Sequence, residues 1–176
     1  MRHVMSSTEV SIEHVGSRPT VHMSRTVPFG RTETWRRLTD PEELRTWFPS
    51  EIIMTDGEWR VGSRLEFRFP PAVLDLTLTG EVLEYTPGAA LAFTWGDEQL
   101  SFELRASGPE TTLVLRNEVP REAVARNAAG WMQCLDRLEG LGTPEGSWRA
   151  HFERFAAAFS PTLGEQVGPP DGYKGA

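Results

Sequence analysis

The spacing of apolar residues changes period along this chain. From Glu51 onwards apolar and polar residues alternate, which is the period of a β-strand with one buried face. Turn-forming pairs such as Pro70-Pro71 and Gly96-Asp97 separate the alternating segments, so they are predicted to form an antiparallel meander with one dry face. The apolar positions are Leu65, Phe67, Phe69, Leu74, Leu76, Leu78, Leu91, Phe93, Trp95, Leu100, Phe102, Leu104, Leu113 and Leu115.

The alternation shifts after Gly80, towards Leu83 and Tyr85. A shift of this kind indicates a β-bulge. The bulge would turn the carboxylate of Glu81 inwards, and the alternative is a glutamate that faces solvent on an ordinary strand.

The longest helical signal covers residues 122–141. Its apolar residues recur at spacings of four, three, four and three, which places them on one face of an α-helix. This face needs a cover, and the strands before it are the only candidates large enough. The face consists of Val124, Ala128, Trp131, Leu135 and Leu138, and a further helix from Ser147 carries Trp148, Phe152, Phe155 and Phe159.

The first part of the chain predicts a hairpin and two short helices. Residues 9–15 and 20–27 are rich in β-forming residues, and Gly16-Ser17-Arg18-Pro19 lies between them as a turn. A helix over residues 31–38 is followed by a second one, for which Asp40 is the N-cap, Pro41 the first residue and Glu43 the partner in a capping box. We expect this second helix to end at Trp47.

These elements predict an α+β fold in which a curved antiparallel sheet wraps around a long C-terminal helix. One domain would cover residues 9–159, with flexible ends at 1–8 and 160–176. Arg25 is unusual because it shares the phase of Val21, Met23 and Val27. Either it lies near a strand end and reaches solvent, or it points into a cavity with a partner.

Composition narrows the function classes. A net charge of -7 and a pI of about 5.2 disfavour binding to nucleic acid or to an anionic membrane. No segment approaches the ~20 apolar residues of a membrane span, and the first residues lack a signal-peptide core, so we expect a cytoplasmic protein. The single cysteine, Cys134, has no disulfide partner and no zinc-ligand spacing around it, and it is interpreted as a buried thiol.

Several phrases resemble one known family. The stretch TETWRRLTDPEELRTWFP, within residues 27–49, is similar to a "VW-x-x-LTDPE-x-L-x-x-WF" motif, and residues 80–84 and 91–95 resemble two central strands. Residues 128–138 resemble a "GW-x-x-x-L-x-x-L" helix. The resemblance, over about 9–159, is to the START-like, Bet v I-like helix-grip superfamily (SRPBCC), in the branch of homologues of the heat-shock-protein-90 ATPase activator.

Two positions depart from the family pattern. Gly30-Arg31 stand where the first helix usually opens with Ser-Pro, and Met132 stands where bacterial members often carry a histidine after the helix tryptophan. The resemblance implies a cavity between helix and sheet. Members commonly bind apolar small molecules, lipids or polyketides there, a few catalyse cyclisation or related acid/base chemistry, and the eukaryotic namesake binds a chaperone.

The residues themselves contain no familiar catalytic motif, and the four histidines share no metal-like spacing. Most carboxylates, among them Glu66, Asp75, Glu103 and Asp136, fall off the apolar phases, so Glu81 is the exception to follow. We therefore expect binding of an apolar or aromatic small molecule without a cofactor or metal. Enzymatic use of the same cavity, a homodimer and a chaperone contact stay open as alternatives. The residues predicted to contact the ligand are Arg25, Phe67, Phe69, Phe93, Trp95, Phe102, Asn117, Trp131 and Leu135.

Overall fold

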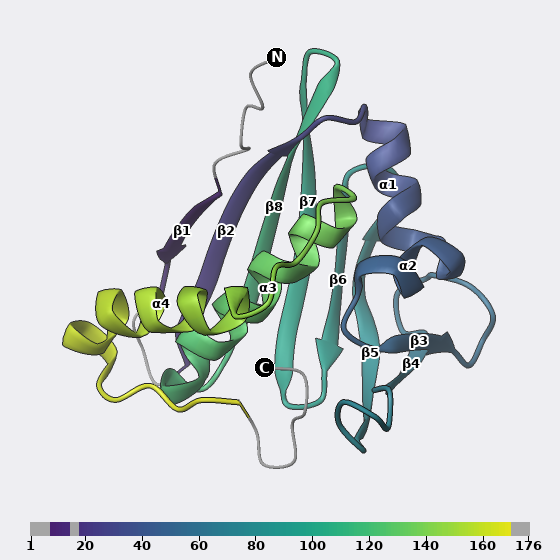
Figure 1. The fold of residues 1–176 in the computed structure, drawn as a ribbon. Helices are drawn as coiled ribbons and strands as arrows, with labels where there is room; N and C mark the ends of the chain where they lie inside the picture. The colour runs from purple at the N-terminus through teal and green to yellow at the C-terminus, as the bar shows by residue number, and fades with distance from the viewer. Residues whose placement is uncertain (1–7, 15–17, 170–176) are drawn as a thin grey trace.

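The computed structural model describes residues 8–14 and 18–169. Within these residues eight strands form one antiparallel sheet, in the order β1-β2-β8-β7-β6-β5-β4-β3 (Figure 1). The strands are β1 (Glu9–Ile12), β2 (Thr20–Val27), β3 (Glu51–Met54), β4 (Arg64–Arg68), β5 (Thr77–Thr86), β6 (Ala90–Trp95), β7 (Glu98–Ser107) and β8 (Glu110–Glu118). The helices are α1 (Arg31–Thr39), α2 (Pro41–Trp47), α3 (Val124–Leu138) and α4 (Ser147–Leu163), and a 3-10 turn, η1 (Arg121–Ala123), precedes α3.

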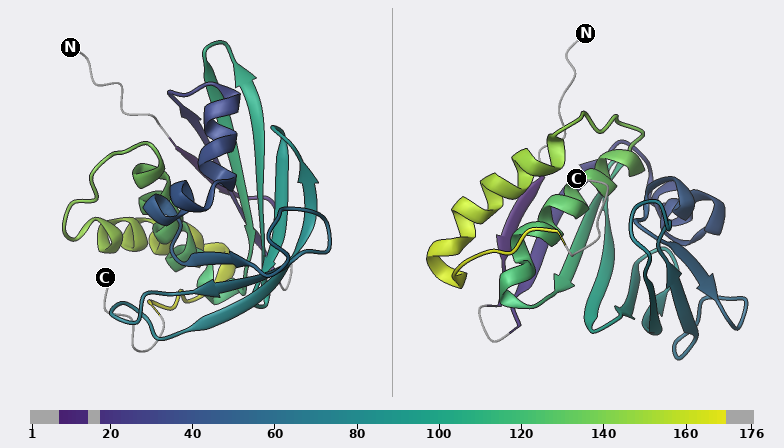
Figure 2. Two further views of the ribbon diagram at one scale, coloured as in Figure 1. Left: turned by 90° about the vertical axis from the view of Figure 1, so that its right-hand side faces the viewer. Right: turned by 60° about the horizontal axis from the view of Figure 1, so that its bottom comes forward.

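The helices gather on one side of the sheet, which curves around them (Figure 2). Helix α3 crosses this concave face, and α4 packs against α3. All five residues of the predicted helical face, from Val124 to Leu138, are at most 2% exposed. The predicted α+β helix-grip architecture is thereby confirmed.

Helix α2 begins as its sequence predicts, with one difference. The side chain of Asp40 accepts a hydrogen bond from the backbone N–H of Glu42 at 2.9 Å, and Pro41 is the first helical residue. Glu43 does not complete the predicted capping box. Its carboxylate instead accepts from Arg36 at 2.6 Å, and the backbone N–H of Asp40 is already bonded to the carbonyl of Arg36.

The sheet differs from the predicted alternation at two places. Leu74 and Leu76 precede β5 and lie in a loop, because the backbone turns back on Pro70, whose carbonyl accepts from the N–H of Leu74 at 3.0 Å. The predicted bulge is present, but between Val82 and Glu84, so that Val82 is buried and Leu83 exposed. The predicted hairpin of β1 and β2 is confirmed by their antiparallel pairing, although positions 15–17 of its turn lie outside the described residues.

Helix α4 continues past Ser160, where a tail was expected to begin, and ends at Leu163. The next residues return to the start of α3, which has no capping side chain of its own. Gln166 takes this role, because its Oε1 accepts from the backbone N–H of Ala125 at 2.9 Å and its Nε2 donates to the carbonyl of Arg121 at 2.9 Å. A segment after α4 thereby satisfies a helix end 41 residues earlier in the chain.

Replacing Gln166 with alanine is expected to lower the free energy of unfolding by about 1 kcal/mol, the typical effect of losing an N-cap. Urea denaturation measures this change. The matched control is Gln99→Ala on β7, an exposed side chain for which we expect a change within about 0.5 kcal/mol. Equal effects of the two substitutions would contradict the capping role.

Candidate ligand-binding site

A pocket of about 320 Å³ opens beside α3, where this helix faces the ends of β6 and β7 and the loop before β5. We call it the α3 pocket. Apolar side chains dominate its wall, and polar groups are confined to α3 and to the β6–β7 turn. The lining residues are Pro49, Phe69, Leu74, Leu76, Leu78, Trp95, Asp97, Glu98, Arg126, Asn127, Gly130, Trp131, Cys134, Trp148 and Pro169.

Three of the residues predicted to contact a ligand, Phe69, Trp95 and Trp131, line the α3 pocket. The two indole rings lie 5.5 Å apart between centroids, and the ring of Phe69 lies 5.9 Å from that of Trp95. These three side chains come from the end of β4, from β6 and from α3. The fold therefore brings them together as the alternation of the strands and the helical face predicts.

Four other predicted residues, Phe67, Phe93, Phe102 and Leu135, lie in the core and are at most 3% exposed. The rings of Phe67 and Phe93 stack at 5.6 Å, so the space between sheet and helix is packed in this region. Phe48, at the end of α2, fills the remaining space in this region. Besides the neighbouring ring of Trp47, the ring of Phe48 lies within 6.3 Å of four aromatic rings, those of Phe67, Phe93, Trp95 and Trp131.

Phe48 thus fills part of the volume in which a ligand cavity was expected. Trp47 adds to this, since its indole lies edge-on to Phe102 at 5.9 Å and its N–H donates to the carbonyl of Arg37. The α3 pocket is what stays open beyond these two side chains. The sequence predicts the two short helices but not how far Phe48, which follows the second of them, reaches inwards.

Arg25 lies away from the pocket, on β2 opposite the C-terminal end of α3. Its side chain is 2% exposed, and its guanidinium is 2.8 Å from the carboxylate of Asp136 and 2.7 Å from that of Glu139. Its Nε also donates to the hydroxyl of Thr8 at 2.6 Å. Of the two interpretations of Arg25, a solvent-reaching side chain is wrong. The residue is buried with partners, and it joins β2 to α3.

Asn117, one of the residues predicted to contact the ligand, is fully buried directly behind the pocket wall. Its Oδ1 accepts from the indole N–H of Trp131 and from Nδ2 of Asn127, both at 2.9 Å. Its Nδ2 donates to the carbonyl of Gln99 at 3.1 Å and to Glu98 at 3.3 Å. Asn117 therefore positions three residues that line the pocket, Glu98, Asn127 and Trp131.

The sequence analysis did not single out Glu98. Its carboxylate lines the α3 pocket and is held there by hydrogen bonds from two asparagine side chains. Its Oε2 accepts from Nδ2 of Asn127 at 2.9 Å as well as from Asn117. A signal for it was present, because Glu98 continues the phase of Leu100, Phe102 and Leu104 backwards by one step and so points to the inner face.

Burial raises the pKa of Glu98 to about 7, and the neighbouring charge of Asp97 adds to this rise. The amide donors of Asn117 and Asn127 and the charge of Arg126 act in the opposite direction. The folded state therefore binds the carboxyl proton of Glu98 more tightly than the unfolded chain does. Protonated Glu98 contributes its full stability below pH 4.5, and this contribution is lost as the pH rises through about 7.

Glu81, the other inward candidate, is exposed on β5, opposite Arg64 of β4. The interpretation as a solvent-facing strand glutamate is confirmed, since the bulge lies beyond it and leaves its phase unchanged. Cys134 is 3% exposed, and burial raises the pKa of its thiol to about 12, so the thiol form prevails at neutral pH. Within the described ranges no three His, Cys, Asp or Glu side chains converge as metal ligands.

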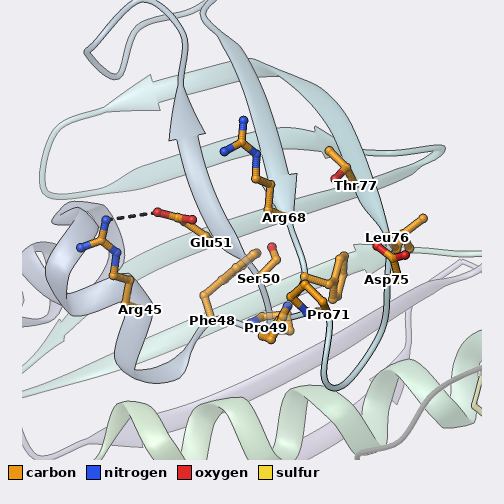
Figure 3. Close-up of a pocket in the computed structure, with 12 residues that line it drawn as sticks. Arg45, Phe48, Pro49, Ser50, Glu51, Arg68, Pro71, Asp75, Leu76 and Thr77 are labelled. Atoms are coloured by element: carbon orange, nitrogen blue, oxygen red, sulfur yellow. Dashed lines mark hydrogen bonds and ion pairs between the residues drawn. The ribbon is translucent and has the colours of Figure 1, made fainter.

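A second hollow of about 470 Å³ adjoins the α3 pocket and shares Pro49, Phe69 and Leu76 with it. Figure 3 shows its charged residues at the rim, where Arg45 contacts the carboxylate of Glu51 at 3.1 Å. Arg68 is likewise bonded, to Glu66 on its own strand. Asp75 lines the hollow as well, so four of its 12 lining residues are charged, which makes it the less suitable of the two for an apolar ligand.

Two buried polar side-chain atoms among the described residues have no hydrogen-bond partner. One is the hydroxyl of Ser50, in the second hollow, and the other is the indole nitrogen of Trp95, in the wall of the α3 pocket. An unpaired buried donor costs about 1–3 kcal/mol. Both atoms belong to side chains that line a hollow, so an energetic penalty of this size lies beside each of the two hollows.

Residues 29–142, more than half of the chain, match the family described as "Activator of Hsp90 ATPase homolog 1-like protein". The chain belongs to this family. The match to this Hsp90-activator-like family confirms the resemblance of the motifs, including membership of the SRPBCC superfamily. No curated protein matches the chain significantly. No helix in the described part of this family member is long and apolar enough to cross a membrane.

Solved structures share the fold of this Hsp90-activator-like domain. EF2215 from Enterococcus faecalis, a conserved protein of unknown function, is 22% identical over 85% of this chain and 91% of its own, with a TM-score of 0.68. CalU16 from Micromonospora echinospora is 21% identical over 86% of this chain and 97% of its own, with a TM-score of 0.69. DynU16, from the dynemicin biosynthetic locus, is 25% identical over 69% of this chain and 46% of its own, with a TM-score of 0.59.

Proposed function

We propose that this Hsp90-activator-like domain binds an apolar, aromatic small molecule in the α3 pocket. The observation that carries the proposal is the wall itself, in which Trp95, Trp131 and Phe69 face a space of about 320 Å³. Small-molecule sites are commonly hollows of about 300–1,000 Å³, lined by apolar and aromatic side chains with a few polar groups. The α3 pocket has this composition.

Two further observations support a ligand at this place. The indole nitrogen of Trp95 is buried without a partner, so a rotation of this ring that brings the nitrogen to an acceptor on an occupant would relieve a penalty. DynU16, whose fold is similar, is a putative protein in the dynemicin biosynthetic locus. The alternative is that the surface around the α3 pocket contacts a second copy of the chain or a chaperone. Such a contact would cover the α3 pocket without filling it.

Gly130 gives a direct test, because it lies inside α3, lines the pocket, and a Cβ placed there meets nothing within 4 Å. Gly130→Leu should therefore occupy the pocket with a side chain. We expect the affinity for methoxynaphthalene, a neutral aromatic probe, to fall at least tenfold, an effect of about 1.4 kcal/mol or more. Isothermal titration calorimetry measures this change.

The same substitution should not destabilise the fold, since leucine favours a helix interior over glycine by up to about 1 kcal/mol. This separates loss of binding from loss of folding. The matched control is Arg137→Leu, which adds a leucine to the exposed side of the same helix and should leave affinity unchanged. Undiminished binding by Gly130→Leu would place the probe elsewhere and reject the α3 pocket.

An enzymatic use of the α3 pocket is supported by one observation, the carboxylate of Glu98 at its wall. Burial holds the pKa of Glu98 near 7, which suits a group that gains and loses a proton at neutral pH. The neighbouring Asp97 is 80% exposed and lies 3.9 Å from Arg18, so it is a poor second member of a catalytic pair. Binding is therefore the function that the pocket supports best.

A further inference from the structure

We propose that Glu98 and Arg126 form a subsite of the α3 pocket that selects aromatic ligands carrying a phenolic hydroxyl. This inference rests on the proposed binding function and adds the chemical class of the ligand. It depends on the direction of the hydrogen bonds at Glu98, on the charge of Arg126, and on the aromatic side chains that line the same pocket.

Only one of the two carboxylate oxygens of Glu98 accepts hydrogen bonds from the described residues. Both amide donors, from Asn117 and Asn127, bond to Oε2, whereas Oε1 makes no hydrogen bond within the described residues. Asn117 is itself fixed, because it is fully buried and receives the indole N–H of Trp131. The network thus leaves one carboxylate oxygen of a residue in the pocket wall available as an acceptor.

Arg126 lines the same pocket from α3, and its charge acts on Glu98. Its guanidinium makes no hydrogen bond within residues 8–14 and 18–169, so it offers donors only. An acceptor and a donor that line one pocket match a hydroxyl, which donates through its hydrogen and accepts through its oxygen.

The local charges favour a neutral group over a charged one. Glu98 and Arg126 carry opposite charges, so an added carboxylate would be repelled by the first and an added ammonium by the second. The other charged groups on this side are Asp97, in the β6–β7 turn, Arg18, and Glu118 of β8. The Arg18 guanidinium lies 3.9 Å from the carboxylate of Asp97 and 3.5 Å from that of Glu118. Both signs are present around the subsite, and the one excess negative charge further disfavours an anionic ligand.

The side chains around this subsite indicate that the rest of the ligand is aromatic. Trp95 and Trp131 present two indole rings whose centroids lie 5.5 Å apart, with an angle of 51° between their planes. Offset and edge-to-face contacts between rings are worth about 0.5–1.5 kcal/mol beyond burial, so aromatic ligands gain more here than aliphatic ones. A ring that carries a hydroxyl unites both requirements.

The inference can be tested with naphthol and its methyl ether, methoxynaphthalene, which keeps the ring and the oxygen but lacks the donated hydrogen. At pH 8, calorimetry should show naphthol binding about tenfold more tightly, as expected for a hydrogen bond to a charged acceptor. The pKa of Glu98 of about 7 adds a pH signature. The hydroxyl binds the ionised carboxylate, so naphthol affinity should rise about fivefold from pH 6 to pH 8, below the phenol pKa of about 10.

Glu98→Gln is the decisive variant, because its amide oxygen can still accept from Asn117 and Asn127 while its NH2 replaces the free acceptor with a donor. Naphthol and the methyl ether should then bind with similar affinity, and the pH dependence between 6 and 8 should disappear. Arg126→Gln should reduce the naphthol preference by a smaller factor. Glu84→Gln, an exposed glutamate on β5, is the matched control and should keep the tenfold preference.

The outcomes separate this inference from the function on which it rests. If both probes bind equally to the native protein, the subsite is rejected while pocket binding stands. If the ether or a low pH is preferred, Glu98 acts as a protonated donor, and the hydroxyl assignment is likewise overturned. If neither probe binds, the proposed function and the subsite both fail.

Discussion

Arg25→Met is expected to lower the free energy of unfolding by about 3–5 kcal/mol, the usual effect of removing one member of a buried ion pair. Arg25 is 2% exposed and meets two carboxylates, Asp136 and Glu139, at 2.8 and 2.7 Å. Methionine fills similar space but leaves both carboxylates without their cation, and Glu139 is only 6% exposed. Guanidinium denaturation followed by tryptophan fluorescence measures the loss.

The control for Arg25 is Arg64→Met on β4, which removes the same charge from an exposed position and should change stability by no more than about 0.5 kcal/mol. The folded Arg25→Met protein should bind methoxynaphthalene as the native protein does, because Arg25 does not line the α3 pocket. A weakened affinity with unchanged stability would instead return Arg25 to the ligand site, where its apolar register first suggested a place for it.

Gly80→Ala is the second substitution with a large expected effect, a loss of about 3 kcal/mol of unfolding free energy, the upper end of the usual range for overpacking. A Cβ at this position would lie 1.9 Å from the carbonyl oxygen of Thr94 on β6 and 2.9 Å from the ring of Phe67. No side-chain rotation relieves overlap with a backbone atom, so β5 and β6 must separate. Thermal unfolding should show a lowered midpoint.

The movement of β6 would also displace Trp95, so the affinity of Gly80→Ala for methoxynaphthalene should fall together with its stability. Gly142→Ala, after α3, is the matched control, since a Cβ there meets nothing within 4 Å. It should be neutral or slightly stabilising, because alanine restricts the unfolded chain. A neutral Gly80→Ala would show that the two strands can move apart without penalty.

The fold was predictable because its signals are local. The spacing from Val124 to Leu138 defines the buried face of α3 wherever that helix lies, and the period of two defines the dry faces of the strands. The alternation misled at Leu74 and Leu76, where the two prolines at positions 70 and 71 turn the backbone before a partner strand is reached. Periodicity predicts which face of a strand a residue occupies, but it does not predict whether a neighbouring strand pairs with that segment.

The candidate site was predictable only in part, because it depends on contacts between distant segments. Trp95 and Trp131 follow from the strand phase and the helical face. The inward reach of Phe48 depends instead on how α2 docks on the sheet. The carboxylate partners of Arg25 come more than 100 residues later, since Glu139 is 114 positions away. Glu98 was accessible to sequence reasoning, had the phase of β7 been extended past its first leucine.

The place of β2 in the sheet affects how this protein emerges from the ribosome. One edge of β2 pairs with β1, but the other pairs only with β8, and Thr26 meets Thr112 at a separation of 86 residues. At a synthesis rate of about 5–20 residues per second, that edge waits on the order of ten seconds for its partner. During this interval Val21, Met23 and Val27 are not yet buried, and one backbone edge of β2 is unpaired. The nascent chain therefore exposes a strand to which a chaperone can bind, or through which chains can aggregate.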